Sequence, residues 1–339
     1  MRRRTRRSVL EGPTRPPEPS RLRPPCGDEE GFVSLRPSSN GPLGRRVSVF
    51  RLGYNTNGLA HHRLDDALRL LAELGYGGVA ITPDVGQLDP QRSDARDLEA
   101  IAGLAADLDL TIAIETGARF LLDPKRKHFP TLLEEDLADR YRRLRFLIQA
   151  IETAAALGAE VVTIFSGMAP GGERAEDEQA GAARLEVLWE RLCEGIAGLL
   201  ATARERGVRI GFEPEPGMFL ERPAAFLELR RRLGSAGEDL GLTLDVGHLL
   251  CTDDLPAGRV ISELREHLVH VHLADIRGRV HHHRPFGEGD LDLEDVLSSL
   301  NKVGYGGMAA VELSRDSHRG AQAAEEALTR IRDILGPGA

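Results

Sequence analysis

The chain of 339 residues is 41% hydrophobic and 29% charged, which is typical of a globular protein. Its formal net charge of −9 is uneven, because residues 1–46 hold eleven Arg against five Asp and Glu, so the remainder is strongly acidic. An acidic body argues against a nucleic-acid partner, and the absence of any apolar run near the roughly 18–20 residues that span a bilayer argues against membrane insertion.

The first 46 residues are expected to form a disordered extension. They are rich in Arg and Pro and cannot bury enough apolar surface to fold. A solvated tail is favoured over one that touches an anionic surface. The segment also lacks the apolar stretch of a secretory signal, and Cys26, Cys193 and Cys251 lie far apart without a Cys-x-x-Cys pattern. These features predict a reducing, cytoplasmic location.

From residue 48 onward, short β-branched segments alternate with amphipathic helical segments. Strands are predicted at 48–54, 77–82, 110–115, 159–165, 208–213, 240–245, 268–275 and 308–313. Helices are predicted at 63–74, 92–108, 134–157, 181–206, 223–234, 258–267, 292–303 and 320–335. Eight strands alternating with eight helices favour an α/β fold, a single (β/α)₈ TIM barrel over residues 47–339. At four joints a Gly between helix and strand is the expected helix terminator.

Two loops are long, and both follow predicted strands. Segment 116–133 follows the third strand and segment 276–291 follows the seventh. Barrel enzymes carry out their chemistry at this face, where the strands end. In the second loop Gly287 and Gly289 allow a close approach of the backbone to the site, and Asp290 or Asp292 is expected to cap the helix that follows.

Four successive strands deliver polar side chains to this face. They are Glu213, Asp245, His272 and Glu312. Converging buried carboxylates need a cation, and carboxylates with one imidazole suit a hard or borderline divalent metal. We expect one divalent cation, with Mn²⁺ as the first choice and Mg²⁺, Co²⁺ or Zn²⁺ as alternatives. No P-loop or dinucleotide fingerprint is present, so no nucleotide cofactor is expected.

Each of these residues alone has a simpler structural interpretation. Glu213 and Glu312 could form ion pairs with arginines, Asp245 could cap the next helix, and His272 could be a satisfied core histidine. Their occurrence in register at successive strand ends favours the metal site. His270 shares a strand face with His272 because strand side chains repeat every two residues, so it is expected one layer deeper in the core.

Five motifs carry a family resemblance: GFEP (211–214), LDVGH (244–248), VHVHLAD (269–275), HRPFGEGDLD (283–292) and VEL (311–313). Through them, residues 51–335 resemble the xylose-isomerase-like barrel superfamily, the sugar phosphate isomerase/epimerase group. The resemblance implies that Glu213, Asp245, His272 and Glu312 hold the metal. It is weak for substrate, since members include ketose epimerases, hydroxypyruvate isomerases, inosose dehydratases and abasic-site endonucleases.

The resemblance also implies residues that bind substrate. In ketose 3-epimerases a His three residues after the metal Asp contacts substrate, and His248 stands there. An Arg after the metal His does likewise, and the nearest match is Arg277, one residue closer than expected. Glu115, at the end of the third strand, either contacts substrate polar groups or, as is favoured, forms a structural ion pair with Arg119 or another residue.

In the multi-zinc endonucleases the position of His283 is a second metal ligand. A second cation held by His248, His283 and His281 is therefore one interpretation, although a polar loop that lines the substrate entrance is favoured. Those endonucleases also place histidines after the second and third strands. Here the segments read ITPDVGQ and IETGARF, with Asp84 and Glu115 instead, which argues against a three-metal site.

We expect a metal-dependent isomerase or epimerase of a sugar, sugar phosphate or related hydroxy-ketone. The metal would hold vicinal oxygens and stabilise a cis-enediolate, while Glu213 and Glu312, across the barrel mouth, remove and return the proton. The alternatives are an inosose-type dehydratase, a metal-dependent phosphodiester hydrolase and a non-catalytic metabolite-binding protein. The expected partner is a small sugar-like molecule, and the sequence is also compatible with a homo-oligomer.

Overall fold

A computed structural model describes residues 50–170 and 178–336 of the chain. The predicted disordered extension, residues 1–46, and Cys26 lie outside the described residues. In the described part, Cys193 and Cys251 are free. No helix of this part is long and apolar enough to cross a membrane.

Eight parallel strands form a closed barrel, and β8 pairs with β1 to complete it. The strands are β1 (Arg51–Asn55), β2 (Gly78–Ile81), β3 (Thr111–Glu115), β4 (Val161–Ile164), β5 (Arg209–Phe212), β6 (Leu240–Asp245), β7 (Leu268–Leu273) and β8 (Met308–Val311). Each predicted strand is present, with its ends shifted by up to three residues. The predicted (β/α)₈ barrel is confirmed.

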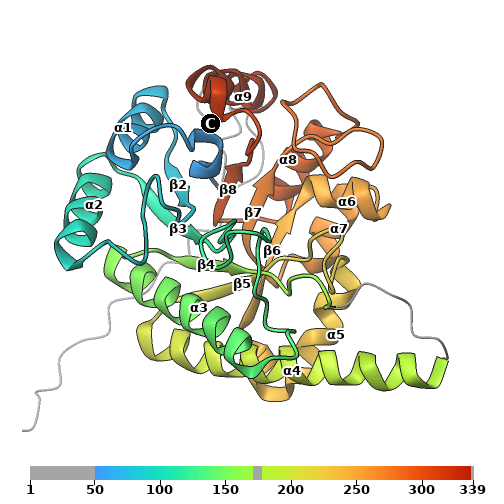
Figure 1. The fold of residues 1–339 in the computed structure, drawn as a ribbon. Helices are drawn as coiled ribbons and strands as arrows, with labels where there is room; N and C mark the ends of the chain where they lie inside the picture. Colours follow the sequence, from blue (N-terminus) through green and yellow to red (C-terminus); the bar gives the residue numbers. More distant parts are fainter. Residues whose placement is uncertain (1–49, 171–177, 337–339) are drawn as a thin grey trace, which may run out of the picture. The chain divides into compact units, whose positions relative to one another are not determined.

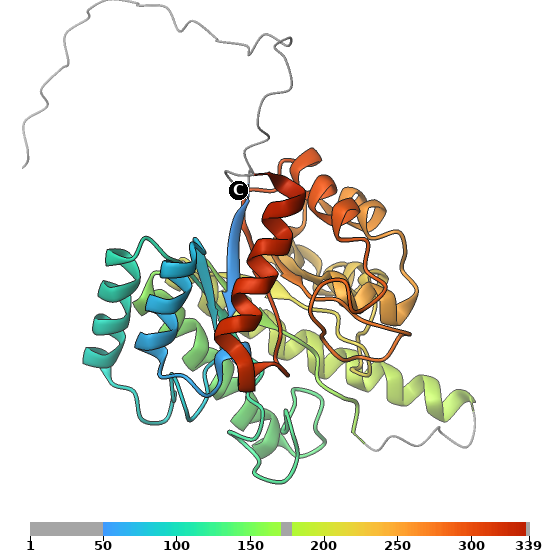
Figure 2. The same ribbon diagram turned by 90° about the horizontal axis from the view of Figure 1, so that it is seen from above.

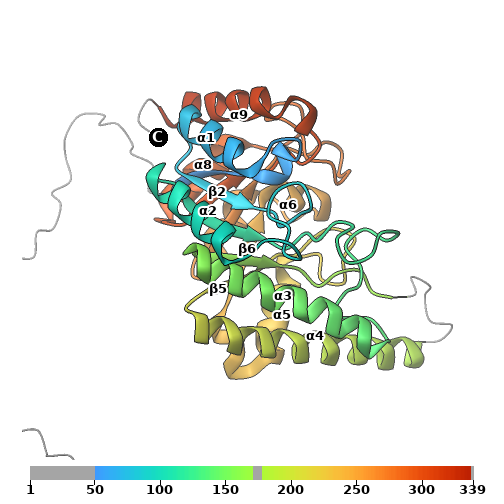
Figure 3. The same ribbon diagram turned by 60° about the vertical axis from the view of Figure 1, so that its left-hand side comes forward.

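Helices surround the strands (Figure 1). The α-helices are α1 (Leu64–Leu74), α2 (Ala95–Asp107), α3 (Leu137–Leu157), α4 (Glu178–Arg206), α5 (Pro223–Leu233), α6 (Val246–Thr252), α7 (Ala257–Leu264), α8 (Leu293–Lys302) and α9 (Gly320–Leu335), with 3₁₀ turns η1 (Thr56–Leu59), η2 (Gly234–Asp239) and η3 (Ser317–Arg319). The last helix, α9, lies between α1 and α8 beside β1 (Figure 2). The two long helices α3 and α4 lie side by side (Figure 3).

Helix α6 was not predicted. It begins immediately after β6, because Asp245 is both the last strand residue and the N-cap of the helix. Its Oδ1 accepts hydrogen bonds from the backbone N–H groups of Gly247 (2.7 Å) and His248 (3.1 Å). No turn residue separates the two elements, so the sequence lacks the loop signal that normally marks a strand-to-helix joint.

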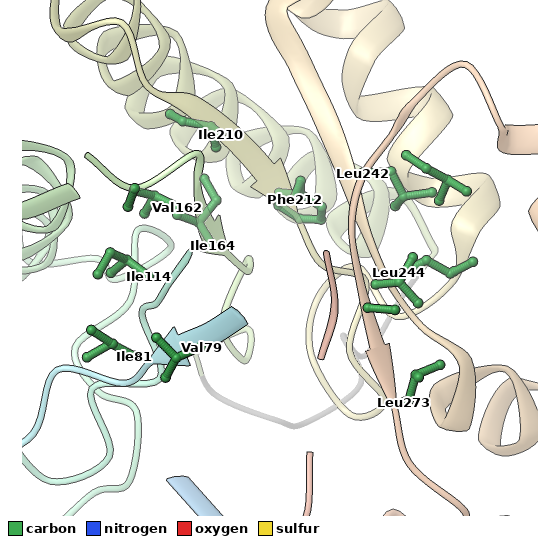
Figure 4. Close-up of a cluster of buried hydrophobic side chains, with 14 of the residues drawn as sticks. Val79, Ile81, Ile114, Val162, Ile164, Ile210, Phe212, Leu242, Leu244 and Leu273 are labelled. Carbon is green, nitrogen blue, oxygen red and sulfur yellow. The ribbon is translucent and has the colours of Figure 1, made fainter. Parts of the chain in front are cut away.

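Strand side chains alternate between the helical layer and the barrel interior. The outward-facing set is apolar and belongs to one large buried cluster with the helices. Figure 4 labels ten members of this cluster, on strands β2 to β7. Deep in the interior, Ala80, Ala113, Met308 and Ala310 form a separate small cluster. Polar side chains occupy the interior nearer the carboxyl ends of the strands, and this polar layer positions the site.

Candidate metal centre and active site

A cavity of about 350 Å³ opens where the strands end. Both long loops contribute to its wall, as predicted: the loop after β3 through Arg119, Lys127 and His128, and the loop after β7 through His281 and His283. Of the predicted site residues, Glu115, Glu213, His248, His283 and Glu312 line the cavity. The structure does not bring Arg277 there; its side chain is exposed and is not part of the cavity wall.

The four predicted metal ligands converge. One ligand atom from each of Glu213, Asp245, His272 and Glu312 lies within 4.8 Å of the others. His272 Nδ1 is 3.0 Å from Glu213 Oε1 and 3.1 Å from Glu312 Oε2. Metal–ligand bonds of roughly 2.1 Å place neighbouring donor atoms about 3.0–3.4 Å apart, so this spacing fits a cation between them.

Asp245 fits both interpretations that the sequence left open, a helix cap and a metal ligand. Its Oδ1 caps α6, whereas its Oδ2 is buried and has no hydrogen-bond partner among the described residues. A buried carboxylate oxygen without a partner is costly. The cap therefore fixes the orientation of the carboxylate and leaves Oδ2 available to a cation.

The electrostatics of the cluster reflect crowded negative charge. Burial raises the pKa of Glu213 well above its ordinary value, and the charges of Glu312 and Glu115 add to the rise against the pull of His272. Burial works to lower the pKa of His272, but Glu115, Glu213 and Glu312 outweigh it and hold that pKa well above 6.5. A divalent cation would neutralise this group more fully than one shared proton does.

Glu115 contacts the side of His272 that faces away from the other ligands. Its Oε1 is 2.9 Å from His272 Nε2 and 3.5 Å from His270 Nε2. The ion pair with Arg119 does not form, since Arg119 lies 3.7 Å from Asp84 instead. An Nε2–H donated to Glu115 leaves the Nδ1 lone pair of His272 for a metal. His270 is buried beside Glu115, one layer below the cluster, as predicted.

Three histidines form a second cluster at the cavity wall. His248 Nδ1 lies 3.2 Å from the Pro214 carbonyl oxygen, to which it donates, so Nε2 carries the lone pair. That Nε2 is 3.4 Å from His283 Nε2 and 3.6 Å from Asp245 Oδ2. Burial, with the two neighbouring imidazoles, lowers the pKa of His281 to about 3. Ligand atoms of His248, His281 and His283 lie within 4.8 Å of one another, so the geometry can accommodate a second cation.

Asp275, which the sequence did not single out, holds the loop that carries His281 and His283. Its carboxylate accepts backbone hydrogen bonds from Gly287, Gly289 and Leu291, each 2.9 Å long. A Cβ on Gly289 would lie 2.2 Å from Asp275 Oδ1, so the glycine is required for this approach. The close approach predicted here is thus to Asp275, and Asp292 caps α8 as expected.

Replacing Asp275 with Ala should destabilise the protein through this loop. Loss of the acceptor leaves the N–H groups of Gly287, Gly289 and Leu291 without their partner, and we expect a cost of about 3 kcal/mol or more. The melting temperature, measured by calorimetry, should fall by roughly 6 °C or more. The control is Asp290→Ala, which removes one exposed hydrogen bond to Gly278. Equal melting temperatures for the two variants would contradict this role.

Several cavity residues were missed by the sequence analysis. Asn57 Nδ2 donates a 2.8 Å hydrogen bond to Glu312 Oε1. Asn57 follows the end of β1, so inspecting the first strand as closely as the last four would have found it. Glu215, Lys127 and Arg315 also line the cavity, but they lie on loops without periodicity, and no local signal marks them.

Comparisons with known proteins find relatives of low sequence identity. The chain is 27% identical over 191 residues to an uncharacterized protein of Methanocaldococcus jannaschii, covering 54% of this chain and 61% of that protein. It is 26% identical over 147 residues to an inosose dehydratase of Glaesserella parasuis, covering 38% and 48% respectively. The chain thus spans only about half to three fifths of the length of these relatives. An L-ribulose-5-phosphate 3-epimerase of Shigella flexneri matches at 26% identity over 253 residues, 73% of this chain and 81% of that one.

Solved structures show the same barrel. A D-tagatose 3-epimerase-like protein matches with a TM-score of 0.65 at 18% identity, covering 85% of this chain and 100% of that chain. The IOLI protein with a bound zinc atom matches with a TM-score of 0.67 at 17% identity, covering 84% and 98%. At these identities the likeness shows the fold alone.

The family assignment rests on a match that covers most of this chain. A family model described as a xylose isomerase-like TIM barrel matches residues 68–334, which is most of the sequence. The match spans the strands from β2 to β8 and therefore every predicted metal ligand. The chain belongs to the xylose isomerase-like TIM barrel family.

Proposed function

We propose that the chain is a divalent-metal-dependent isomerase or epimerase of a hydroxy-ketone of the sugar class. The observation that carries the proposal is the placement of Glu213 and Glu312, which approach His272 Nδ1 at 3.0 and 3.1 Å from β5 and β8. Two carboxylates from different sides of one cation can reach both faces of one substrate carbon. The sugar-epimerase relatives support the same reaction class.

The environments of the two carboxylates differ in a way that suits proton transfer. Burial raises the pKa of Glu213 well above its ordinary value. Burial acts on Glu312 too, but His283, His272 and the Asn57 hydrogen bond keep its pKa below the ordinary value. With the cation bound, one of the two carboxylates would take the proton and the other would return one to the opposite face of the carbon.

A bound divalent cation would supply Lewis acidity that acidifies the carbon-bound proton next to the carbonyl. Glu213, Asp245, His272 and Glu312 are the residues that would hold it. Asp245 and His272 serve only as ligands, because one is oriented by the α6 cap and the other by Glu115. His248 lines the cavity beside them and is assigned to hydroxyl contacts with substrate.

The test is a screen of ketoses and ketose phosphates in D₂O with the manganese-reconstituted protein. We expect a true substrate to gain one deuterium on the carbon next to its carbonyl, seen by NMR and mass spectrometry. Product formation without solvent deuterium would point to a hydride shift and overturn the two-carboxylate scheme.

A second candidate is a dehydratase of the inosose type, favoured by the similarity to an inosose dehydratase. Abstraction of the same proton starts both reactions, so the site residues do not separate them. The product mass does. Loss of one water from a cyclic polyol ketone would assign the dehydratase, whereas an unchanged mass apart from deuterium assigns the isomerase or epimerase.

The His248–His281–His283 cluster favours one further candidate, a phosphodiester hydrolase, since paired metals clamp phosphoryl oxygens in such enzymes. Against it stand the acidic composition of the body and the non-histidine residues Thr82 and Glu115 at the ends of β2 and β3. Two tightly bound metals per chain together with cleavage of abasic-site DNA would establish the hydrolase. We expect no cleavage.

Metal affinity should rise with pH. Glu115, Glu213 and Glu312 overcome the effect of burial and raise the pKa of metal-free His272 well above 6.5, so a proton occupies the imidazole at neutral pH and competes with the metal. Below that pKa the apparent affinity should weaken by roughly tenfold per pH unit. Calorimetry in buffers of different ionisation enthalpy should detect proton release on Mn²⁺ binding. Binding without proton release at pH 7 would contradict the assignment of His272 as a ligand.

A further inference from the structure

Three cationic side chains line the same cavity as the metal ligands. Arg119 and Lys127 come from the loop after β3, and Arg315 follows β8. Lys127 and Arg315 are exposed side chains at the mouth, and neither forms a hydrogen bond or ion pair with any residue of 50–170 or 178–336. Arg119 is more enclosed, lies 3.7 Å from Asp84 and donates to the Asn57 carbonyl oxygen at 3.2 Å.

The three cations lie close enough to act on one another. Partial burial of the Lys127 side chain lowers its pKa, and the charges of Arg119 and Arg315 lower it further against those of Glu215 and Glu312. Asp84, Glu215 and Glu312 are acids near these cations, and of the three cations only Arg119 forms an ion pair with an acid among the described residues. Like charges gathered in this way repel and are stabilised by a bound anion.

Their position relative to the metal ligands is suited to a substrate with a charged end. Ser314 and Arg315 lie two and three residues after Glu312 along the chain, and both line the cavity. Barrel enzymes frequently bind phosphate in the loops after their last strands. An anionic group held at Arg315 would leave the rest of the molecule to extend toward Glu312 and Glu213.

Resting on the proposed function, we infer that the substrate is a phosphate monoester of the hydroxy-ketone and that Arg315, Lys127 and Arg119 bind its phosphate. A phosphate dianion accepts several charge-assisted hydrogen bonds, and a guanidinium matches its oxygens with two parallel N–H donors. A carboxylate offers the same kind of contact with one charge fewer. A neutral sugar would offer Lys127 and Arg315 no charged group to bind.

The experiment compares a ketopentose, its 5-phosphate and a keto sugar acid as ligands of the manganese-loaded protein. Affinity is measured by calorimetry and turnover by deuterium uptake, with inorganic phosphate as a separate competitor. We expect the phosphate ester to be preferred by at least about 10²-fold in kcat/KM and in affinity. Arg315→Ala and Lys127→Ala should each reduce this preference by about tenfold or more and weaken inhibition by inorganic phosphate.

Arg279→Ala is the matched control. Arg279 lies on the loop after β7, pairs with Asp253 and does not line the cavity, so its replacement removes the same charge from the same face. It should leave the preference for phosphate unchanged. If Arg279→Ala and Arg315→Ala had equal effects, Arg315 would act only through its overall charge and not by binding the phosphate. This result would overturn the inference.

Failure of this inference is distinguishable from failure of the proposed function. Equal turnover of the ketopentose and its phosphate would overturn the phosphate inference while leaving the isomerase or epimerase intact. Preference for the sugar acid would assign a carboxylate in place of phosphate and overturn it too. If no ketose takes up deuterium, the proposed function fails, and the calorimetric preference for the phosphate ester still decides the inference.

Discussion

Glu312→Gln is expected to lose proton exchange by at least roughly 10²-fold while it still binds the metal. The amide oxygen can coordinate weakly, so metal content should fall only modestly. The amide has no basic oxygen to accept a proton, however, and the Asn57 contact that now supports the ionised carboxylate at 2.8 Å loses its charged partner. Deuterium uptake and metal analysis on the same sample separate the two effects.

The control for this variant is Glu134→Gln, which replaces a buried glutamate that does not line the cavity. It should retain normal exchange and metal content. If Glu312→Gln bound metal and still exchanged deuterium into a true substrate at the normal rate, the two-carboxylate scheme would be wrong. If it lost the metal altogether, its exchange rate would report a ligand role, and Glu213→Gln would become the test of proton transfer.

Glu115→Gln is expected to weaken metal affinity by about 10–100-fold although Glu115 is not one of the four ligands. The carboxylate accepts from His272 Nε2 at 2.9 Å and thereby fixes the tautomer that presents Nδ1 to the metal. A glutamine at this position offers a neutral oxygen or an amide donor, and the donor would favour the opposite tautomer. Competition with a chelator of known affinity measures the loss.

Nitrogen chemical shifts of His272 provide a second readout. Above the raised pKa of His272 in the metal-free protein, we expect the Nε2–H tautomer in the wild type and a mixture of tautomers in Glu115→Gln. Glu115→Asp should restore the tautomer in part, since it keeps the charge at a shorter reach. An unchanged metal affinity in Glu115→Gln would return Glu115 to the substrate-binding role that the sequence first suggested.

The sequence could predict the elements of this fold because each depends on local pattern. β-branched segments alternate with amphipathic helices, and Gly75, Gly158, Gly207 and Gly304 adopt positive φ at the joints where helix termination was expected. The same pattern predicted that the four proposed metal ligands meet, since strand ends must meet at one face of a barrel. Helix α6 was not predicted because it begins directly after Asp245, with no turn residue to mark its start.

Contacts that depend on distant residues could not be predicted in this way. Glu115 was found as a polar strand end, but its partner His272 is 157 residues away, and Arg119 was the nearer cation in sequence. Arg277 followed a family spacing, yet its side chain stays outside the cavity, and Arg315 from another loop lines it. Loop residues are brought together by the tertiary structure, and the local periodicity of hydrophobic residues carries no information about such contacts.

The most direct measurement is a crystal structure of the manganese-loaded protein with an anomalous difference map. The account predicts a peak bounded by Glu213, Asp245 Oδ2, His272 Nδ1 and Glu312, each within about 2.0–2.6 Å of it. A further peak at His248, His281 and His283 would add a second site without altering the first. A map with manganese at the histidine cluster alone, or with two of the four side chains turned into the helical layer, would contradict the account.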